Sequence, residues 1–182
     1  MLRIVSGSAR GTKLVCPEGL SVRPTHDRVK EALFSMLNTK PVGAHVLDLF
    51  AGSGALGLEA LSRGAEHAVF VDVAASSLSA ARANAEKAHL SNRASFFQTD
   101  YVHFLENTED RFDIIFMDPP YFEGFLLPAL QIIAERKLLR EDGLIYCETD
   151  ASWNTPFSAP FSVIRDKKYG RARVLLLSEM SL

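Results

Sequence analysis

Phe112-Asp113-Ile114-Ile115-Phe116-Met117-Asp118-Pro119-Pro120-Tyr121 is the stretch that decides the fold of this 182-residue chain. Its first six residues are typical of a buried strand, and the last four predict the loop that leaves the strand's carboxyl end. Open α/β sheets bind their ligands at that edge. Because each proline removes a backbone N–H, the loop can only accept hydrogen bonds there. A carboxylate, a carbonyl and an aromatic ring favour a flat guest that carries an amine; a strand-ending turn whose tyrosine merely packs is the alternative.

Strands and helices alternate on both sides of this stretch, which predicts an α/β fold with a mostly parallel, Rossmann-like sheet covered by helices on both faces. The expected strands are 46–50, 68–72, 94–98, 112–117 and 143–148, and the expected helices are 54–63, 76–89, 101–106 and 125–139. Two strand-like runs, 161–165 and 173–178, have no helix between them and predict an antiparallel hairpin. We expect a single domain over 1–182, with an N-terminal arm and helix in 1–40 and the core in 41–182; the arm, residues 1–22, is expected to be a short β-hairpin or an extended segment.

Composition points to an ordinary protein of the cytoplasm. The chain is 47% hydrophobic and 23% charged, and no apolar stretch approaches the ~20 residues of a membrane-spanning helix. Its start lacks the apolar core of a signal peptide. Cys16 and Cys147 match no metal-ligand spacing, and neither do the five histidines. We therefore expect a reduced compartment and no metal.

The net charge is only −2, but basic residues gather at both ends of the chain around an acidic middle. If the two ends meet in space, they form a cationic surface for phosphates. Two unrelated, solvated clusters are the alternative. The candidate phosphate-binding residues are Arg3, Arg10, Lys13, Arg23, Lys167, Lys168, Arg171 and Arg173.

A glycine-rich turn, Gly52-Ser53-Gly54-Ala55-Leu56-Gly57, follows the first expected strand and opens a helix. Glycines permit a tight turn, and the helix start offers unpaired N–H groups. This pattern alone also fits dinucleotide-binding folds. Asp48, four residues before Gly52, would repel a pyrophosphate but can accept a hydrogen bond from an ammonium group. The pair of features favours an amino-acid ligand over a diphosphate.

Two further acids end neighbouring strands. Asp72 can accept both hydroxyls of a ribose, and Asp100 can bond an adenine amino group. Each acid alone is typical of a helix cap or a solvated loop, but Asp48, Asp72, Asp100 and Asp118 close four successive strands at one sheet edge. Ammonium, ribose, adenine and an acceptor for a flat amine together describe S-adenosyl-L-methionine with an amino-group substrate.

Several motifs now resemble one known family. Val46-Leu47-Asp48-Leu49-Phe50-Ala51-Gly52-Ser53-Gly54 is similar to the first motif of class I methyltransferases, and Asp118-Pro119-Pro120-Tyr121 to the catalytic motif of the branch that methylates exocyclic amines. The RsmD-like bacterial methyltransferases, which modify the N2 amine of a guanine in 16S ribosomal RNA, resemble the chain over essentially its whole length. The motifs that carry this likeness are Arg3-Ile4-Val5-Ser6-Gly7, Arg23-Pro24-Thr25, Leu56-Gly57-Leu58-Glu59-Ala60-Leu61-Ser62-Arg63-Gly64-Ala65 and Lys168-Tyr169-Gly170. Asp72 departs from the family, because many relatives carry Glu there.

The resemblance implies a class I methyltransferase fold, a role for each motif and a partner. Asp118, Pro119, Pro120 and Tyr121 would be catalytic: the Asp118 carboxylate and the Pro119 carbonyl orient the amine, and Tyr121 stacks on the base. The expected cofactor-binding residues are Asp48, Phe50, Ala51, Gly52, Ser53, Gly54, Asp72, Asp100 and Thr25. For Arg23-Pro24-Thr25, a plain helix-entry turn remains the alternative. The expected partner is 16S rRNA within an assembling or assembled small ribosomal subunit, bound by a monomer without a membrane.

Three other functions remain open at this point. A nicotinamide-dependent oxidoreductase would use the glycine turn but leaves Asp48 and the proline tetrapeptide unexplained. A methyltransferase acting on DNA adenine or on a protein glutamine would use a similar tetrapeptide. A catalytically silent RNA-binding module of the ribosome would have no need of the four acids.

Overall fold

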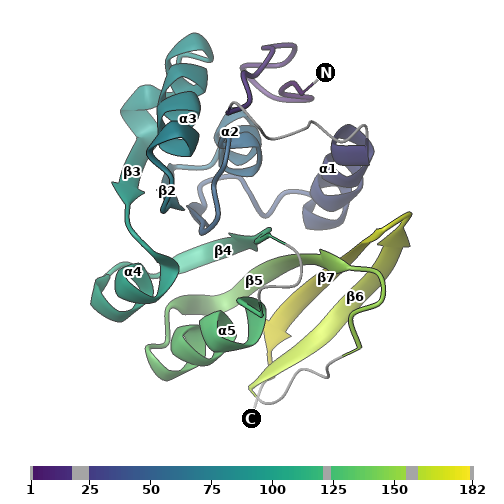
Figure 1. Ribbon diagram of the computed structural model, residues 1–182. Coiled ribbons are helices and arrows are strands. Elements are labelled where there is room, and N and C mark those ends of the chain that lie inside the picture. Colours follow the sequence, from purple (N-terminus) through teal and green to yellow (C-terminus); the bar gives the residue numbers. More distant parts are fainter. Residues whose placement is uncertain (1, 18–24, 121–123, 155–159, 181–182) are drawn as a thin grey trace.

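Seven strands form one mixed sheet at the centre of the computed structural model, which describes residues 2–17, 25–120, 124–154 and 160–180 (Figure 1). The strands are β1 His45–Asp48, β2 His67–Asp72, β3 Ala94–Gln98, β4 Phe112–Met117, β5 Leu139–Asp150, β6 Phe161–Tyr169 and β7 Ala172–Glu179. They lie in the order β3-β2-β1-β4-β5-β7-β6. The first five pair in parallel, whereas β7 pairs antiparallel with both β5 and β6. The predicted parallel sheet with a C-terminal antiparallel hairpin is confirmed.

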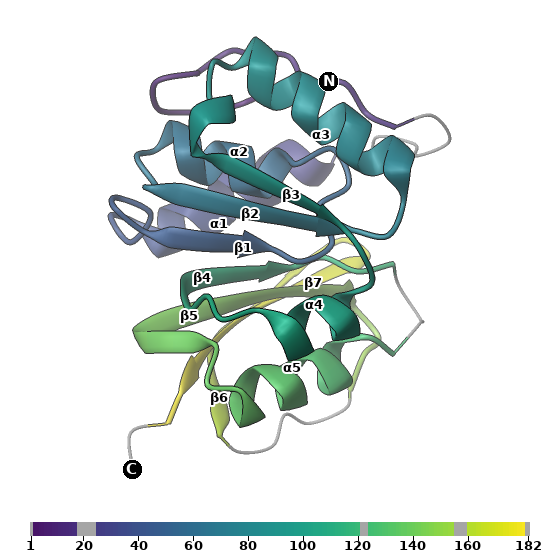
Figure 2. The ribbon, with the colours of Figure 1, turned by 90° about the vertical axis from the view of Figure 1, so that its left-hand side faces the viewer.

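Helices cover both faces of this sheet (Figures 1 and 2). They are α1 Thr25–Leu37, α2 Ala55–Ser62, α3 Ala75–Lys87, α4 Tyr101–Asn107 and α5 Leu126–Glu135, with a short 3-10 helix at Ser91–Arg93. The first three helices pack on one face and share a core with β-strand residues such as Phe70 and Phe116. The α4 and α5 helices pack on the other face around Ile115 and Met117. No helix in the described part of the chain is long and apolar enough to cross a membrane.

The apolar run that decides the fold becomes β4, in the middle of the sheet between β1 and β5. Ile114 and Phe116 point into one core, whereas Ile115 and Met117 point into the other. All four side chains are at most 1% exposed. Parallel strands that are covered on both faces need such an uninterrupted apolar run, because neither face meets water.

One boundary differs clearly from its prediction. The helix expected to reach residue 139 ends at Glu135, and β5 begins at Leu139 and runs to Asp150. The reason is local: Lys137 adopts a left-handed backbone with φ 53°, which a helix cannot continue. The Leu138 N–H then donates back to the Ile133 carbonyl and closes the helix end.

The N-terminal arm (residues 2–17) makes one antiparallel bridge, between Arg3 and Lys13, rather than a full hairpin. It docks on α2 through Glu59, which is fully buried. The Glu59 carboxylate accepts the N–H groups of Val5 and Ser6 at 2.8 and 3.0 Å. Lys30 and Arg63 pair with the same carboxylate at 3.2 and 2.9 Å. A buried charge needs such partners, and the arm is therefore fixed to the core.

Candidate active site

Four acids meet at the carboxyl edge of the parallel strands. Asp48 and Asp72 end β1 and β2, Asp100 follows β3, and Asp118 follows β4. Because the strand order is β3-β2-β1-β4, they stand along the edge as Asp100, Asp72, Asp48 and Asp118. The parallel topology brings together side chains that lie up to 70 residues apart in the sequence.

The glycine turn lies between Asp48 and Asp72 and is tied to β2. Gly52 and Gly54 have φ of 53° and 77°, a conformation that favours glycine. The Gly52 N–H donates to the Asp72 carboxylate at 2.9 Å, and the Ala51 N–H donates to the Val71 carbonyl at 2.9 Å. Behind the turn, the buried Asn84 amide donates to the Ser53 carbonyl at 2.9 Å. The turn is therefore held from two sides, with α2 beginning directly after it.

Asp48 is buried, with 2% of its surface exposed. Its carboxylate accepts the Gly57 N–H at 3.0 Å. Burial raises the pKa of Asp48 to about 7; the Gly57 hydrogen bond opposes that shift and the nearby Asp72 charge adds to it. No Lys or Arg among the described residues forms an ion pair with it. A buried carboxylate without a cationic partner in the described fold suits a cationic ligand.

Asp72 and Asp100 also bond to the backbone around them. The two oxygens of Asp72 accept the N–H groups of Gly52 and Ala74 at 2.9 and 2.8 Å. Asp100 caps α4, where it accepts the His103 N–H at 2.9 Å. A carboxylate has about four acceptor positions, so each can still bind a hydroxyl or amino group. A capping role and a ligand-binding role are therefore compatible at Asp100.

Three aromatic rings meet at the same edge. Phe50 follows β1, Tyr101 begins α4 after β3, and Phe125 directly precedes α5 after β4; their ring centroids lie 5.5 to 5.7 Å apart. Phe125 thus packs within the fold against Phe50 and Tyr101. Tyr101 was not predicted; its position one residue after Asp100 at the start of a helix is the signal that sequence alone offered. The cluster gives this edge an apolar floor.

The Asp118–Pro120 loop continues β4 directly. Asp118 is half-buried, Pro119 is buried and Pro120 is exposed. Tyr121, the predicted stacking residue, lies outside the described residues, as does Arg23. Thr25 begins α1, but its side chain is likewise outside the described part.

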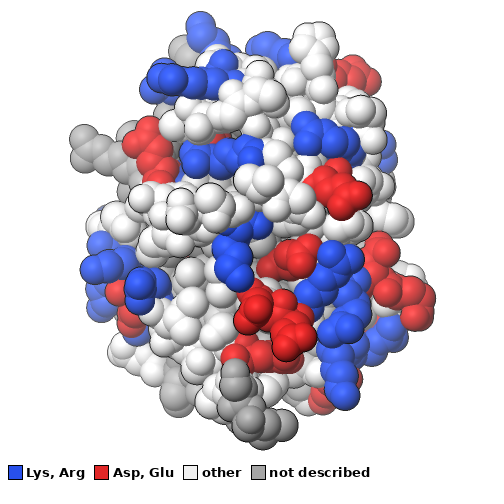
Figure 3. Space-filling model, turned by 180° about the vertical axis from the view of Figure 1, so that it is seen from behind, with Lys and Arg blue, Asp and Glu red and all other residues white. Residues whose placement is uncertain are grey.

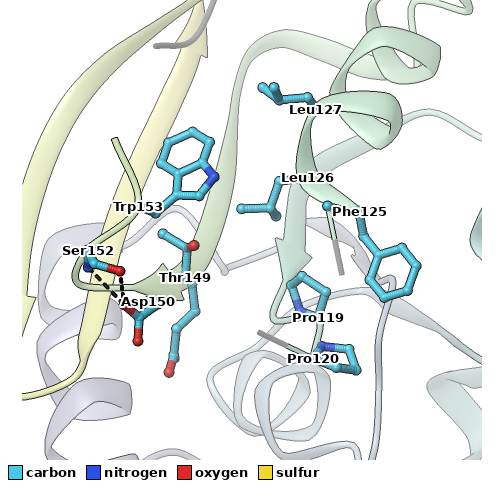
Figure 4. A pocket seen from close by; sticks show the side chains of 11 residues that line it. Pro119, Pro120, Phe125, Leu126, Leu127, Thr149, Asp150, Ser152 and Trp153 are labelled. Atoms are coloured by element: carbon cyan, nitrogen blue, oxygen red, sulfur yellow. Dashed lines mark hydrogen bonds between the residues drawn. The ribbon is translucent and has the colours of Figure 1, made fainter. Parts of the chain in front are cut away.

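A cavity of about 280 Å³ opens beside this loop (Figure 4). Pro119 and Pro120 form one wall, and the carboxyl end of β5 together with the residues after it forms another. The lining residues that sequence reasoning missed are Glu148, Thr149, Asp150, Ser152 and Trp153. The signal for them was weak: the fifth strand was expected to end at the same edge, but no motif marks the residues at and beyond its carboxyl end.

The basic ends of the chain do not form one surface. The arm lies beside α2 and α3, whereas β6 and β7 lie at the far side of the sheet, with α1 between the two regions (Figure 1). Seen from behind, the basic side chains form separate groups divided by uncharged and acidic surface (Figure 3). The reason is that the arm is bonded to Glu59 on α2 and Asn84 on α3, whereas β6 is the edge strand of the sheet beside β7. The joined cationic surface is therefore wrong for the described residues, and two separate basic groups remain.

The individual basic residues differ in exposure. The side chains of Arg3, Arg10, Lys13, Lys167, Lys168 and Arg171 are exposed. Arg173 is different, because its guanidinium pairs with both oxygens of Asp166 at 3.0 and 2.6 Å and also donates to the Trp153 carbonyl. Its contacts are better explained by a structural brace than by the phosphate contact predicted for it.

Known proteins resemble the chain over nearly its full length. The model of the family described as conserved hypothetical protein 95 matches residues 2–178. Bacillus subtilis YlbH is 39% identical over 96% of this chain and 97% of that protein. Ribosomal RNA small subunit methyltransferase D of Escherichia coli K12 is 36% identical over 93% of this chain and 86% of that protein.

Solved structures show the same relationship. Escherichia coli yhhF has a TM-score of 0.87 at 34% identity, covering 99% of this chain and 98% of that one. SMU.776, complexed with SAH (S-adenosylhomocysteine), has a TM-score of 0.72 at 21% identity, covering 88% of this chain and 51% of that one; this likeness concerns the fold alone.

Proposed function

Because the chain belongs to the family described as conserved hypothetical protein 95, we propose that it methylates small-subunit ribosomal RNA with S-adenosyl-L-methionine. Its similarity to ribosomal RNA small subunit methyltransferase D of Escherichia coli supports the RNA substrate. The finer proposal is that the methyl group goes to the exocyclic N2 amine of one guanine in 16S rRNA. The observation that carries it is the Asp118–Pro120 loop, in which Pro119 and Pro120 have no backbone N–H and which stands at the same sheet edge as the buried Asp48.

The cofactor proposal rests on the fit of this edge. When bound, S-adenosyl-L-methionine supplies a sulfonium-activated methyl group. Asp48 would neutralise its ammonium group, Asp72 would accept its ribose hydroxyls, and Asp100 would accept the adenine amino group. The turn at Phe50, Ala51, Gly52, Ser53 and Gly54 would contact it through the backbone, and Thr25 would cover its methionine end. The lack of a cationic partner for Asp48 among the described residues supports this fit.

The catalytic task of the chain is to orient a weak nucleophile. The lone pair of a guanine amine is delocalised into the ring. Hydrogen bonds from its two N–H groups to the Asp118 carboxylate and the Pro119 carbonyl would turn the lone pair toward the methyl group. Because positive charge grows on nitrogen during transfer, fixed acceptors stabilise the transition state more than the ground state. Holding the two reactants in line adds a further entropic contribution, for which ~7–11 kcal/mol is the general upper range.

The RNA would be held by its phosphates while one base turns out of its stack into the site. Arg3, Arg10 and Lys13 on the arm, and Lys167, Lys168 and Arg171 on the hairpin, are exposed and can contact phosphates. Two small, separate basic groups predict modest affinity for naked RNA and a steep dependence on salt. We therefore propose that a monomer acts in the cytoplasm on an assembling or assembled small subunit.

A labelled-methyl assay tests the proposal directly. The purified protein is incubated with S-adenosyl-L-methionine carrying a labelled methyl group and with either naked 16S rRNA or small subunits from cells that lack this protein. Mass mapping then locates the label. We expect a single N2-methylguanine, formed faster in subunits than in naked RNA. Preference for naked RNA would refute the particle as substrate, and label on another base or atom would refute the guanine assignment.

A further inference from the structure

Trp153 forms one wall of the cavity beside the Asp118–Pro120 loop. Its indole faces Leu126 and Leu127 across the opening, whereas the Phe125 ring points away from it (Figure 4). Ligand pockets commonly enclose ~300–1,000 Å³. At about 280 Å³, this cavity is suited to a single base rather than to a whole nucleotide cofactor. Its shape and place therefore suit the acceptor base, with one flat aromatic wall.

The segment that carries Trp153 is held by its own hydrogen bonds. The Asp150 carboxylate accepts the backbone N–H of Ser152 at 2.9 Å, and the backbone N–H of Trp153 donates to the Asp150 carbonyl at 3.0 Å. The Ala151 N–H donates to the Arg171 carbonyl at 2.8 Å, which ties the segment to the start of β7. The indole is thus presented from an ordered turn, as a preorganised wall requires.

Arg173 braces this turn from β7. Its Nη1 donates to the Trp153 carbonyl, while Nε and Nη2 hold both oxygens of Asp166 on β6. Such a two-point pair fixes the guanidinium plane. The pair lowers the pKa of Asp166 and raises that of Arg173, chiefly through the side-chain hydrogen bonds between them. Because Lys167 and Lys168 follow Asp166 directly, the basic strand and the cavity wall form one connected unit.

We propose that Trp153 is a surface on which the target base stacks, in addition to the stacking predicted for Tyr121, and that Arg173 is the positioning residue that holds Trp153 in place. This inference rests on the proposed function, because it assigns a wall to the site that receives the acceptor base. The indole offers a large π-face that stacks on any base, while Asp118 and Pro119 select the amine. Trp153 also packs partly against the core around α5, so a purely structural role is the competing explanation.

Fluorescence separates these two roles without any substitution, because Trp153 is the only tryptophan of the chain. The probe is a single-stranded RNA hexamer with one guanine, added to the full chain in the presence of S-adenosylhomocysteine. The matched control is the same hexamer with an abasic site in place of that guanine. We expect the guanine hexamer to quench the emission, and the abasic hexamer to leave it unchanged. Equal emission with both, at concentrations where anisotropy of a labelled hexamer shows both to be bound, would overturn the inference.

Kinetics on small subunits test the roles of both residues. Stacking worth ~1–3 kcal/mol corresponds to a rise in KM of about five- to 150-fold for Trp153→Ala, with cofactor affinity unchanged. Trp153→Phe keeps a stacking ring and should recover most of that loss. Arg173→Gln should raise KM in the same direction and reduce the guanine quenching. The controls are Phe97→Ala, a half-exposed aromatic on β3, and Arg136→Gln, an arginine that likewise holds backbone carbonyls but far from the cavity.

The outcomes distinguish this inference from the proposed function. If the wild-type protein transfers no methyl group to ribosomal RNA, the proposed function fails. If the wild type is active and Trp153→Ala binds the cofactor normally with a KM within two-fold of wild type, only the stacking role fails. If Trp153→Ala loses cofactor binding as well, while the wild type shows no guanine quenching, Trp153 is a structural residue and the inference is overturned.

Discussion

Asp48→Asn should separate two effects of the buried Asp48 carboxylate: its effect on the affinity for a cationic ligand and its effect on the stability of the protein without that ligand. The pKa of Asp48 is about 7, raised mainly by burial. If the ammonium group binds only the ionised form, the apparent Kd is multiplied by one plus ten to the power of (pKa − pH). This factor is roughly 33 at pH 5.5 and roughly two at pH 7, so the wild-type Kd should fall roughly 16-fold over that range. An α-amino group has a pKa of about 7.7–8.0, so the ligand's own amine is mostly protonated up to pH 7, and the range stops there.

The same carboxylate should have the opposite effect on the stability of the protein without cofactor. Its pKa in the folded state lies above the ordinary 3.8, so the folded state holds the proton more tightly than the unfolded state. The resulting stabilisation is complete below pH 3.8 and is lost as the pH rises to about 7. The difference between those two pKa values corresponds to roughly 4 kcal/mol. Asp48→Asn keeps an acceptor for the Gly57 N–H but has no charge, so it should be more stable than the wild type at pH 8.

Calorimetric titration with S-adenosyl-L-methionine and thermal unfolding, each across pH, measure these two effects. Asp48→Asn should bind more weakly at pH 7, lose the pH dependence of Kd, and show a higher Tm at pH 8. The control is Asp100→Asn, which changes an exposed acid at the same edge. It should leave the slope of Kd against pH unchanged. A wild-type Kd that is equal at pH 5.5 and pH 7, or a variant that keeps the wild-type slope, would refute the assignment of Asp48 to the ammonium group.

Three further predictions concern catalysis and the N-terminal arm. Asp118→Ala should lower kcat by about 100- to 1,000-fold while the Kd for the cofactor stays nearly constant, as measured by single-turnover methylation and titration calorimetry; an active variant would contradict the role of Asp118. Glu59→Gln leaves Lys30 buried without its counter-charge and should cost about 3–5 kcal/mol in urea unfolding, whereas the control Glu109→Gln, at a 95% exposed side chain, should change little. Gly7→Ala should lower Tm far more than Gly11→Ala, because both have positive φ but only at Gly7 would a Cβ lie 1.8 Å from the Ser62 carbonyl oxygen; equal losses would mean that backbone strain alone matters.

Much of the sheet could be predicted because its signals are local. The uninterrupted apolar run 112–117 predicts a strand buried on both faces from local sequence alone. Parallel strands necessarily put the acids that follow them at one edge of the sheet. The buried Glu59 could not be foreseen in the same way. It lies on a helix whose other face carries the apolar pattern, and it is buried only because the arm docks over it.

The far side of the site depends on contacts between distant segments. Charge alone grouped Arg173 with Lys167 and Lys168, but the antiparallel register of β6 and β7 puts it within reach of Asp166 and Trp153. The two basic ends are equally informative: composition shows that they are basic, but only the strand order shows that they are separated. Trp153 stands in no repeat or motif, and its role follows from the turn after β5.

The docked arm holds its basic residues at a fixed distance from the glycine turn. Asn84 bonds both the arm, at Val15, and the glycine turn, at Ser53, and the Glu59 carboxylate accepts the Val5 N–H near the start of the arm. If Arg3 or Arg10 contacts an RNA phosphate, as proposed, the distance from that phosphate to the reacting atoms is fixed before the RNA binds. If the substrate is an assembling small subunit, as proposed, methylation would then depend on whether the RNA has already reached this distance, because the arm is fixed to the core.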